Sequence, residues 1–279
     1  MIVYGSEIAN ELKQELKEKI AKLKKRKPEL NVILVGDNKA SLSYIKSKEK
    51  ASAAVGITFR LHHLKEDTSQ DEVLKLIEKL NGDKEVDAIL VQLPLPRHID
   101  SRLILNAIKP DKDVDGLTDY NAGRLSLGED GFVPCTPLGI MKILEKMDVD
   151  ITGKRAVVVG RSNLVGLPVA RLLLKKDATV TIAHAKSKDL RSITKEADIL
   201  VVAIGKGRYI DDTYIKDGAY VIDVGINHVD GKLCGDVDFD KVVDKVKAIT
   251  PVPKGVGPMT VCMLLENVYK AYLIHEESI

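Results

Sequence analysis

The chain has 279 residues, which is enough for one large hydrophobic core or two ordinary ones. Hydrophobic residues make up 44% of the chain and charged residues 30%, a balance typical of a globular protein and not of a disordered one. The net charge of +2 gives no electrostatic reason to expect nucleic-acid binding, and no apolar stretch reaches the roughly 18 residues that a membrane span needs.

The first half of the chain alternates helical and strand patterns. Apolar residues spaced along one face predict a first helix over residues 6–25. Further helices are expected over residues 41–54, 70–80 and 99–108, and strands over residues 31–35, 58–64 and 87–92. A polar stretch from Pro110 to Pro137 follows; it is long for a simple connection, and such loops are often functional.

The second half repeats the alternation after a helix expected over residues 138–147. Strands are predicted near residues 155–159, 178–183, 198–204, 219–224 and 246–249, and a final helix over residues 259–273. Strands that alternate with helices imply parallel sheets with helices on their faces. We therefore expect two α/β domains, with the boundary near residue 138.

The segment KRAVVVGRSNLVGLP, residues 154–168, combines a buried strand, a glycine turn and the start of a helix. Such a turn can hold a diphosphate, because the backbone approaches closely and the free N–H groups of the helix start point at the anion. The match to the dinucleotide fingerprint is imperfect: Gly160 fills the first glycine position, Ser162 the second, and Gly166 comes one residue late. An ordinary strand–helix turn is the alternative.

The next strand predicts which dinucleotide binds. In NAD-binding folds an acidic residue usually ends this strand and accepts the ribose hydroxyl. Here the strand ends in His184, Ala185 and Lys186, with no carboxylate, while Arg161 lies in the first turn. Two cations suit a 2′-phosphate and favour NADP over NAD; alternatively, they are ordinary surface charges.

Several polar side chains are candidates for chemistry in the first half. Tyr44 and Lys48 are four residues apart on a predicted helix and share one face, although a solvated lysine beside a tyrosine is the simpler interpretation. Gln92 lies at the carboxyl end of a strand, where open α/β sheets bind ligands, and could orient a lysine or satisfy loop backbone. Asp113 and Asp115 in KDVDG could grip a planar donor pair or stabilise the turn before a glycine.

The cysteines and one apolar residue complete the candidates. Cys135, Cys234 and Cys262 are widely separated and odd in number, which indicates a reducing cytoplasm and no disulfide framework. Cys135 in PCTP is a candidate nucleophile, but a buried structural thiol is favoured.

Ile226 could contact a cofactor ring or belong to the core. The N-terminus has no signal-peptide pattern, and no spacing of Cys or His predicts a metal site.

Taken together, these motifs resemble one family over essentially the whole chain, the bifunctional methylenetetrahydrofolate dehydrogenase/methenyltetrahydrofolate cyclohydrolases. The motifs occur in the order SLSYIKSK, VQLPLP, KDVDGL, PCTP, VVVGRSNLVGLP, DVGIN, GDV and TPVPKGVGPMT. The resemblance implies two α/β domains with a cleft between them: a folate-binding catalytic domain over residues 1–137 and a Rossmann-like NADP-binding domain over 138–258. The last segment, 259–279, is expected to pack back on the first domain.

The resemblance also implies roles for particular residues. Lys48 is expected to be the catalytic lysine of the cyclohydrolase step, with Tyr44 beside it, Gln92 positioning it and Asp115 binding the pterin edge. Further substrate contacts are implied for Leu93, Pro94, Leu95, Gly257 and Pro258. Dinucleotide contacts are implied for Gly160, Arg161, Ser162, Gly166, Ala185, Lys186 and Ile226.

The implied reactions are oxidation of 5,10-methylenetetrahydrofolate to the methenyl compound with NADP, and its hydrolysis to 10-formyltetrahydrofolate. They belong to one-carbon metabolism and supply purine biosynthesis. The resemblance further implies a homodimer, with no nucleic-acid or membrane partner.

The chain departs from the family pattern at two positions. Lys254 replaces a glycine that is usual in the last loop, and Ala185 replaces a Ser or Arg near the 2′-phosphate, which weakens the case for NADP. The alternatives are a member with dehydrogenase activity only, an enzyme acting on another reduced pterin, and a non-catalytic protein that senses dinucleotides.

Overall fold

The computed structural model describes residues 1–277; Ser278 and Ile279, at the end of the segment expected to pack on the first domain, lie outside the described residues. The chain folds into two compact units, each built from two separate stretches. Unit 1 combines Met1–Asn10 with Thr136–Thr260, and unit 2 combines Glu11–Cys135 with the chain from Val261 onward. The final helix therefore belongs mostly to unit 2, and the first ten residues belong to unit 1.

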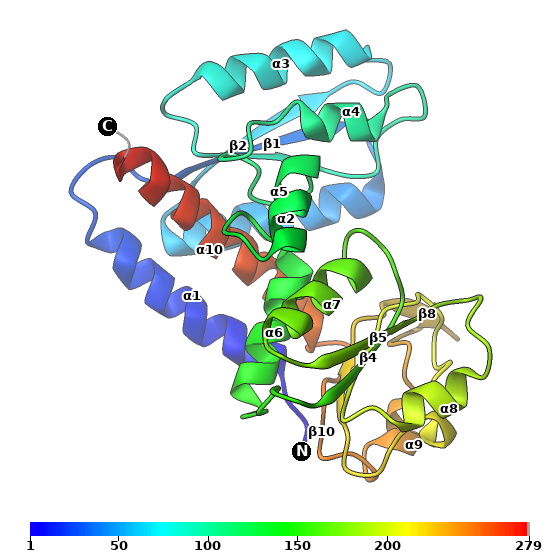
Figure 1. Cartoon of the computed structure of the whole chain (residues 1–279). Helices are drawn as coiled ribbons and strands as arrows, with labels where there is room; N and C mark the ends of the chain where they lie inside the picture. Colours follow the sequence, from blue (N-terminus) through cyan, green and yellow to red (C-terminus); the bar gives the residue numbers. More distant parts are fainter. Residues whose placement is uncertain (278–279) are drawn as a thin grey trace. The chain divides into compact units, whose positions relative to one another are not determined.

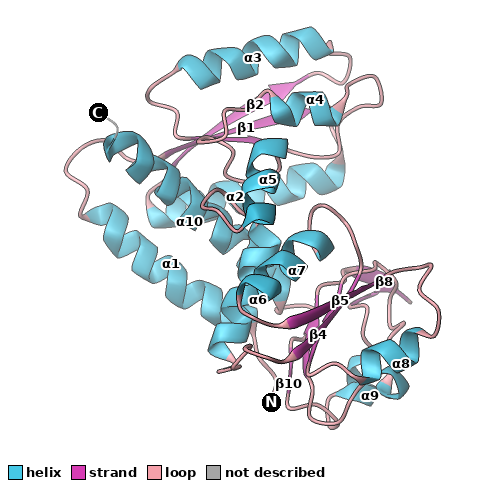
Figure 2. Ribbon diagram, in the orientation of Figure 1, coloured by secondary structure: helices cyan, strands magenta, loops and turns pink. Residues whose placement is uncertain are grey.

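Unit 2 is built on three parallel strands in the order β2-β1-β3 (Figures 1 and 2). The strands are β1 (Glu29–Val35), β2 (Thr58–Leu64) and β3 (Ala88–Val91). The helices are α1 (Gly5–Ala21, which starts in unit 1), α2 (Lys39–Val55), α3 (Gln70–Gly82), α4 (Ser101–Asn106), α5 (Asp119–Leu127) and α10 (Val256–Glu277, which also starts in unit 1). Every residue of the central strand β1 is buried, as expected for a parallel strand covered on both faces.

Local sequence signals explain where these helices begin. Asn38 caps α2 by accepting hydrogen bonds from the backbone N–H groups of Ala40 and Ser41. Ser69 and Glu72 form a reciprocal capping box at the start of α3. The apolar face of α3 then packs on β1 and β3 in a core that also includes Ile104 of α4.

Three sequence-based expectations for unit 2 are wrong in extent. The first helix ends at Ala21 and not at Lys25, because the Lys27 ammonium donates to the Ile20 carbonyl and satisfies a helix-end acceptor. The helix expected over 99–108 spans only Ser101–Asn106, since the Asp100 side chain accepts from the first N–H groups and fixes the start. The stretch 110–137 is not a structureless loop.

That stretch contains α5 and the start of α6 (Cys135–Lys146). Thr118 caps α5 by accepting from the N–H of Asn121, and Gly128 ends it in the left-handed conformation that glycine adopts readily. Helix α5 was not predicted, because its residues are mostly polar and form no apolar stripe. The apolar spacing predicted the start of α6 at residue 138, three residues too late.

Unit 1 contains a five-stranded parallel sheet in the order β10-β7-β6-β4-β5. Its strands are β4 (Arg155–Val159), β5 (Thr179–Ala183), β6 (Ile199–Val202), β7 (Tyr220–Asp223) and β10 (Ala248–Ile249). The helices are α6, α7 (Gly166–Lys175), α8 (Leu190–Lys195) and α9 (Phe239–Val242), with a short 3₁₀ turn at Asp212–Tyr214 and a hairpin of β8 (Asn227–Val229) with β9 (Lys232–Cys234). Strand order reverses between β4 and β6, which is where doubly wound sheets bind ligands.

A buried ion pair connects separate parts of unit 2. Both carboxylate oxygens of Asp87 accept from the Arg26 guanidinium, at 2.6 and 2.7 Å. The Glu29 N–H and the His275 ring, from the final helix, also contact this carboxylate, at 2.9 and 3.1 Å. Burial would raise the pKa of Asp87, but these partners, Arg26 first, outweigh it and hold the pKa below its ordinary value.

We expect Asp87→Asn to lower the free energy of unfolding by about 3 kcal/mol, because it leaves the Arg26 charge without its buried partner. Since the folded-state pKa is depressed, the contribution is complete above about pH 4, the ordinary aspartate value, and is lost as the pH falls further. Urea unfolding at several pH values measures it. Asp119→Asn, which breaks the exposed pair with Arg102, is the control and should leave the midpoint unchanged. Equal effects of both substitutions would contradict the assignment.

Candidate active site

In unit 2, a lysine and an amide meet at the carboxyl end of β3. The Lys48 ammonium, on α2, donates to Oε1 of Gln92 at 2.9 Å. The Gln92 amide donates in turn to the Leu93 carbonyl at 2.8 Å. This two-step chain fixes the rotamer of Gln92 and aims its oxygen at the lysine. The structure therefore brings together two residues that are 44 positions apart in the sequence.

Tyr44 lies one helical turn before Lys48 and is 52% exposed. A large aromatic side chain that is left open next to a half-buried lysine provides a flat surface for a ring. Leu93 and Leu95, which follow Gln92, are partly exposed, and Pro94 between them is exposed. Tyr44 and Pro94 are therefore open to contact with a small molecule, whereas Leu95 packs in part against the core of unit 2.

Asp115 is surrounded by groups that change its acidity. Burial of the carboxyl raises its pKa, although the residue keeps some solvent contact, and the positive charge of Lys48 opposes this shift. The Cys135 thiol donates to Oδ1 of Asp115 at 3.4 Å. Neighbouring Asp113 instead accepts from the N–H groups of Leu117 and Thr118, so it stabilises the turn.

Cys135 is a structural thiol and not an activated nucleophile. It is buried, and its pKa lies well above the ordinary value because of burial and the adjacent Asp115 carboxylate. Asn267 of α10 supports the same region by donating to the carbonyls of Val114 and Val133. Sequence reasoning missed the contacts of Cys135 and Asn267 with this region, because no spacing rule connects positions so far apart.

In unit 1, the turn after β4 has the close backbone packing that a diphosphate site requires. Gly160 has φ of 128°, and a Cβ there would run into the Ala203 carbonyl after β6. A Cβ at Gly166 would run into the Gly160 backbone, so this glycine lets α7 start against the turn. The Ser162 hydroxyl accepts from the N–H groups of Val165 and Gly166, at 3.2 and 3.4 Å, and holds the loop in shape.

The turn after β5 carries the expected phosphate partners. Ser187 closes it by accepting from the His184 N–H at 2.9 Å. Ala185, Lys186 and, in the first turn, Arg161 are all exposed. These turns follow β4 and β5, which are parallel neighbours in the sheet, so both cations lie at the carboxyl end of the sheet. The exposed geometry suits a phosphate that approaches from solvent.

A pocket of about 310 Å³ lies beside the end of β7. Ile226, Gly257 and Pro258 all line it, and Ile226 is 53% exposed. Lys254 is part of the same wall and has φ of 77°, a left-handed conformation that disfavours a side chain and favours glycine. The lysine therefore adopts the glycine-like backbone of the loop at a cost of about 1–2 kcal/mol, and the loop shape does not depend on a glycine there.

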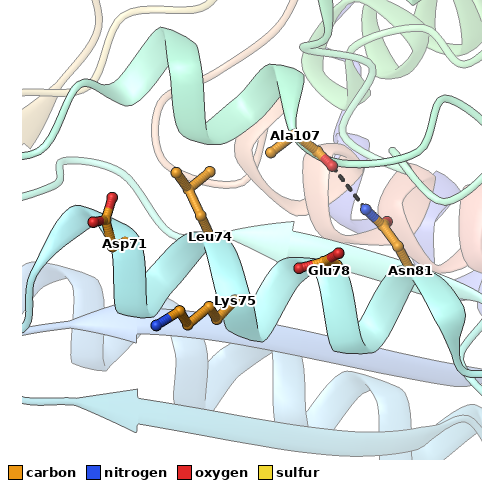
Figure 3. A pocket seen from close by; sticks show the side chains of 6 residues that line it. All are labelled: Asp71, Leu74, Lys75, Glu78, Asn81 and Ala107. Atoms are coloured by element: carbon orange, nitrogen blue, oxygen red, sulfur yellow. Dashed lines mark hydrogen bonds between the residues drawn. The ribbon is translucent and has the colours of Figure 1, made fainter.

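Unit 2 contains a different hollow, which is lined mainly by polar and charged side chains. It measures about 430 Å³ and is lined by residues of α3 and by Ala107, including Asp71, Lys75 and Asn81 (Figure 3). The Asn81 amide donates to the Ala107 carbonyl at 2.7 Å and closes one end. None of the expected site residues lines this hollow, so it is separate from the Lys48 site.

The described residues show neither a metal-binding cluster nor a membrane-spanning helix. Within residues 1–277, no group of three or more His, Cys, Asp or Glu side chains is arranged to hold a metal ion. Over the same residues, no helix combines the length and apolar character required to cross a membrane.

Comparisons with known proteins agree with both halves of this geometry. Residues 3–115 match the model of the tetrahydrofolate dehydrogenase/cyclohydrolase catalytic domain, and residues 134–276 match that of the tetrahydrofolate dehydrogenase/cyclohydrolase NAD(P)-binding domain. The bifunctional protein FolD of Agathobacter rectalis is 52% identical over 273 residues, covering 97% of this chain and 98% of that protein.

Two solved structures are similar along nearly their whole length. The bifunctional enzyme FolD of Campylobacter jejuni has a TM-score of 0.97 and 48% identity, with 100% of this chain and 99% of that one covered. The Trypanosoma brucei methylenetetrahydrofolate dehydrogenase-cyclohydrolase, solved with NADP and an inhibitor, has a TM-score of 0.93 and 39% identity, with 98% and 97% covered. The chain therefore belongs to the tetrahydrofolate dehydrogenase/cyclohydrolase family.

Proposed function

We propose that the chain catalyses two consecutive reactions. The first oxidises 5,10-methylenetetrahydrofolate to 5,10-methenyltetrahydrofolate with NADP, and the second hydrolyses that product to 10-formyltetrahydrofolate. Family membership over both units supports this assignment. The observation that carries it is the hydrogen bond from Lys48 to Gln92 at the carboxyl end of β3.

In the dehydrogenase reaction the protein mainly has to align the folate with the nicotinamide ring. NADP, when bound, accepts the hydride that leaves the methylene carbon of the folate. We assign its diphosphate to the turn over residues 160–166, because Gly160 and Gly166 let this turn pack closely against the loop after β6 and against the start of α7. Arg161 and Lys186 are assigned to the 2′-phosphate, with Ser162 and Ala185 shaping the same two turns. Ile226 is assigned to contact with the cofactor ring.

The cyclohydrolase reaction needs a group that handles protons. Water attacks the electrophilic methenyl carbon, and the proton that the water loses must be accepted while the ring opens. Lys48 is assigned to accept this proton at its Nζ, acting as the neutral amine, whose N–H can still donate to Gln92. Gln92 positions that atom, since its Oε1 lies 2.9 Å away and its own amide is fixed by Leu93. Tyr44 lies on the same face of α2 and is assigned to the folate ring.

Asp115 is assigned to the donor edge of the pterin, where a carboxylate accepts two parallel hydrogen bonds. Leu93, Pro94 and Leu95 supply apolar contact with substrate, and Gly257 and Pro258 carry the same substrate-binding assignment from the family resemblance. The intact pair of Lys48 and Gln92 favours the bifunctional enzyme over a member with dehydrogenase activity only. The presence of Lys48 and Asp115 also argues against a non-catalytic dinucleotide sensor.

We place this enzyme in the cytoplasm, as a homodimer that supplies one-carbon units to purine biosynthesis. None of the three cysteines, all within the described residues, forms a disulfide, which fits a reducing compartment. Strand β5 is at the edge of the unit 1 sheet, and Ile182 on it is 38% exposed. Leu167 and Leu174 on α7 are 40% and 51% exposed. An open strand edge beside exposed apolar side chains is a surface suited to a second copy of the chain.

Lys48→Met should reduce hydrolysis of methenyltetrahydrofolate by a factor of about 10²–10⁴, the usual contribution of a positioned proton-transfer group. The decay of methenyl absorbance without NADP measures this step alone, and NADPH formation in the same variant should persist. Lys46→Met, on another face of α2, is the matched control and should keep both activities. Hydrolysis at the normal rate in the Lys48 variant would remove Lys48 from the mechanism.

Asp115→Asn should raise the KM for methylenetetrahydrofolate by about tenfold or more, as expected for loss of a charged hydrogen bond. In the unsubstituted enzyme the folate KM should rise as the pH falls, because the carboxylate becomes protonated. Since burial raises the pKa of Asp115, this rise should start at a higher pH than for an exposed aspartate. Steady-state kinetics from pH 4 to 8 measures both effects; an unchanged acid limb in the variant would exclude Asp115 as its source.

Arg161→Ala and Lys186→Ala should each raise the KM for NADP by about tenfold, the expected loss of one charged contact with a phosphate. The KM for NAD, which has no 2′-phosphate, should stay the same. Lys188→Ala, an exposed lysine two residues further on, serves as control. Kinetics with both dinucleotides decides, and a strong preference of the unsubstituted enzyme for NAD would overturn the choice of NADP.

A further inference from the structure

Two buried aspartates lie next to each other at the carboxyl end of the unit 1 sheet and have no assigned role. Asp223 ends β7 in the motif DVGIN, and Asp236 follows β9 in the motif GDV. Their exposed fractions are 3% and 0%. Burial of a carboxylate is costly unless its oxygens are fully hydrogen-bonded, so their partners show what the two residues hold in place.

Asp236 holds the loop that follows β6. Its Oδ2 accepts from the N–H groups of Ile204 and Gly205, at 2.7 and 3.0 Å. Its Oδ1 accepts from the Lys206 N–H at 2.7 Å and from the Asn227 side-chain amide at 2.9 Å. Three consecutive backbone N–H groups of one loop are thus fixed by a single carboxylate.

Asp223 holds the two segments on either side of the β8–β9 hairpin. Its Oδ1 accepts from the N–H groups of Gly225 and Asp236, at 3.1 and 2.9 Å. Its Oδ2 accepts from the Val237 N–H at 2.9 Å. The bond to the Asp236 N–H connects the two carboxylates, so each depends on the position of the other. We call Asp223 and Asp236 together the carboxylate clamp.

Glycines leave room for the carboxylate clamp. A Cβ at Gly225 would overlap the Asp236 carboxylate, and a Cβ at Gly235 would overlap the Asp223 carboxylate. No cation bonds to either carboxylate among the described residues; their printed donors are backbone N–H groups and one side-chain amide. The clamp is therefore a close-packed, hydrogen-bonded support for backbone and not an ion-pair network.

The loops that the clamp holds lie at the dinucleotide end of the sheet. β6 is hydrogen-bonded to β4, and a Cβ at Gly160 would contact Ala203, the residue that begins the loop held by Asp236. Sheet order reverses between these two strands, which is where such folds bind their ligand. Gly225, held by Asp223, directly precedes the exposed Ile226.

We propose that Asp223 and Asp236 are positioning residues for NADP, which fix the loops over residues 203–206 and 224–227 in the conformation that the dinucleotide requires. The inference rests on the proposed function. Because the N–H groups of residues 204–206 already donate to Asp236, they are not free for a phosphate. The diphosphate is assigned to the turn over residues 160–166, and the clamp fixes the loops beside it.

Asp236→Asn is the sharpest test. Each carboxylate oxygen of Asp236 accepts from two N–H groups, so the NH₂ that replaces one oxygen would point at two donors and could bond to neither. We expect the Kd for NADP, measured by calorimetry, to rise at least tenfold, and the KM for NADP to rise with it. The folate KM and the hydrolysis of methenyltetrahydrofolate without NADP should stay unchanged. Asp223→Asn should act in the same direction.

Asp198→Asn is the matched control. Asp198 lies in the same unit and also accepts a backbone N–H, that of Arg155 at 2.9 Å, but at the amino ends of β4 and β6. It should leave NADP affinity unchanged. If Asp236→Asn fails to fold, Asn227→Ala removes one donor and keeps the carboxylate, and a Kd about threefold higher is expected.

The inference would be overturned if the folded Asp223 and Asp236 variants bind NADP with a Kd within twofold of the unsubstituted value. If those variants do not fold, the same result in Asn227→Ala would overturn it. An equal loss of affinity in Asp198→Asn would also overturn it, because the effect would then be general destabilisation of unit 1. Failure of the proposed function would look different: the unsubstituted chain itself would bind no NADP and turn over no folate.

Discussion

Parallel pairing of strands is the constraint on which both sites depend. In a parallel sheet all carboxyl ends lie at one edge, and the loops that leave this edge come close together. In unit 2 this places Gln92, after β3, within reach of Lys48. In unit 1 it places the turn at Gly160 against the loop that follows β6. Because the central strands β1 and β6 are buried along their whole length, functional polar side chains lie where strands end and not within these two strands.

The buried carboxylates differ in how their charge is balanced. Asp87 is paired with a guanidinium, its pKa is depressed, and it holds the final helix to the core of unit 2. Asp115 has a thiol donor, and Asp223 has only backbone donors; burial raises the pKa of both, that of Asp223 to about 7. Asp87, with its bonded cation, is structural, whereas Asp115 and Asp223, with neutral donors and raised pKa, lie where ligands are expected.

The sequence pattern predicts the strands of the two parallel sheets to within about two residues, because most of these strands are short apolar or β-branched runs. It does not predict the β8–β9 hairpin. It was not sufficient for α5, whose polar residues lack an apolar stripe, or for the end of α1, which depends on a side chain six residues beyond Ala21. The site residues Lys48, Gln92 and Asp115 were named through motif resemblance. Their contacts, and those of Cys135, Asn267 and Asp236, join positions far apart in sequence and required the structure.

The division of the chain has a consequence for protein engineering. The backbone passes between the two units at residues 10–11, 135–136 and 260–261, and each of these points lies inside a helix. A gene fragment cut at residue 135 would lack Asn267, which donates to the carbonyls of Val114 and Val133 beside Asp115. Neither unit can be excised as one continuous fragment, so isolating either one would require circular permutation or a synthetic linker that joins its two stretches.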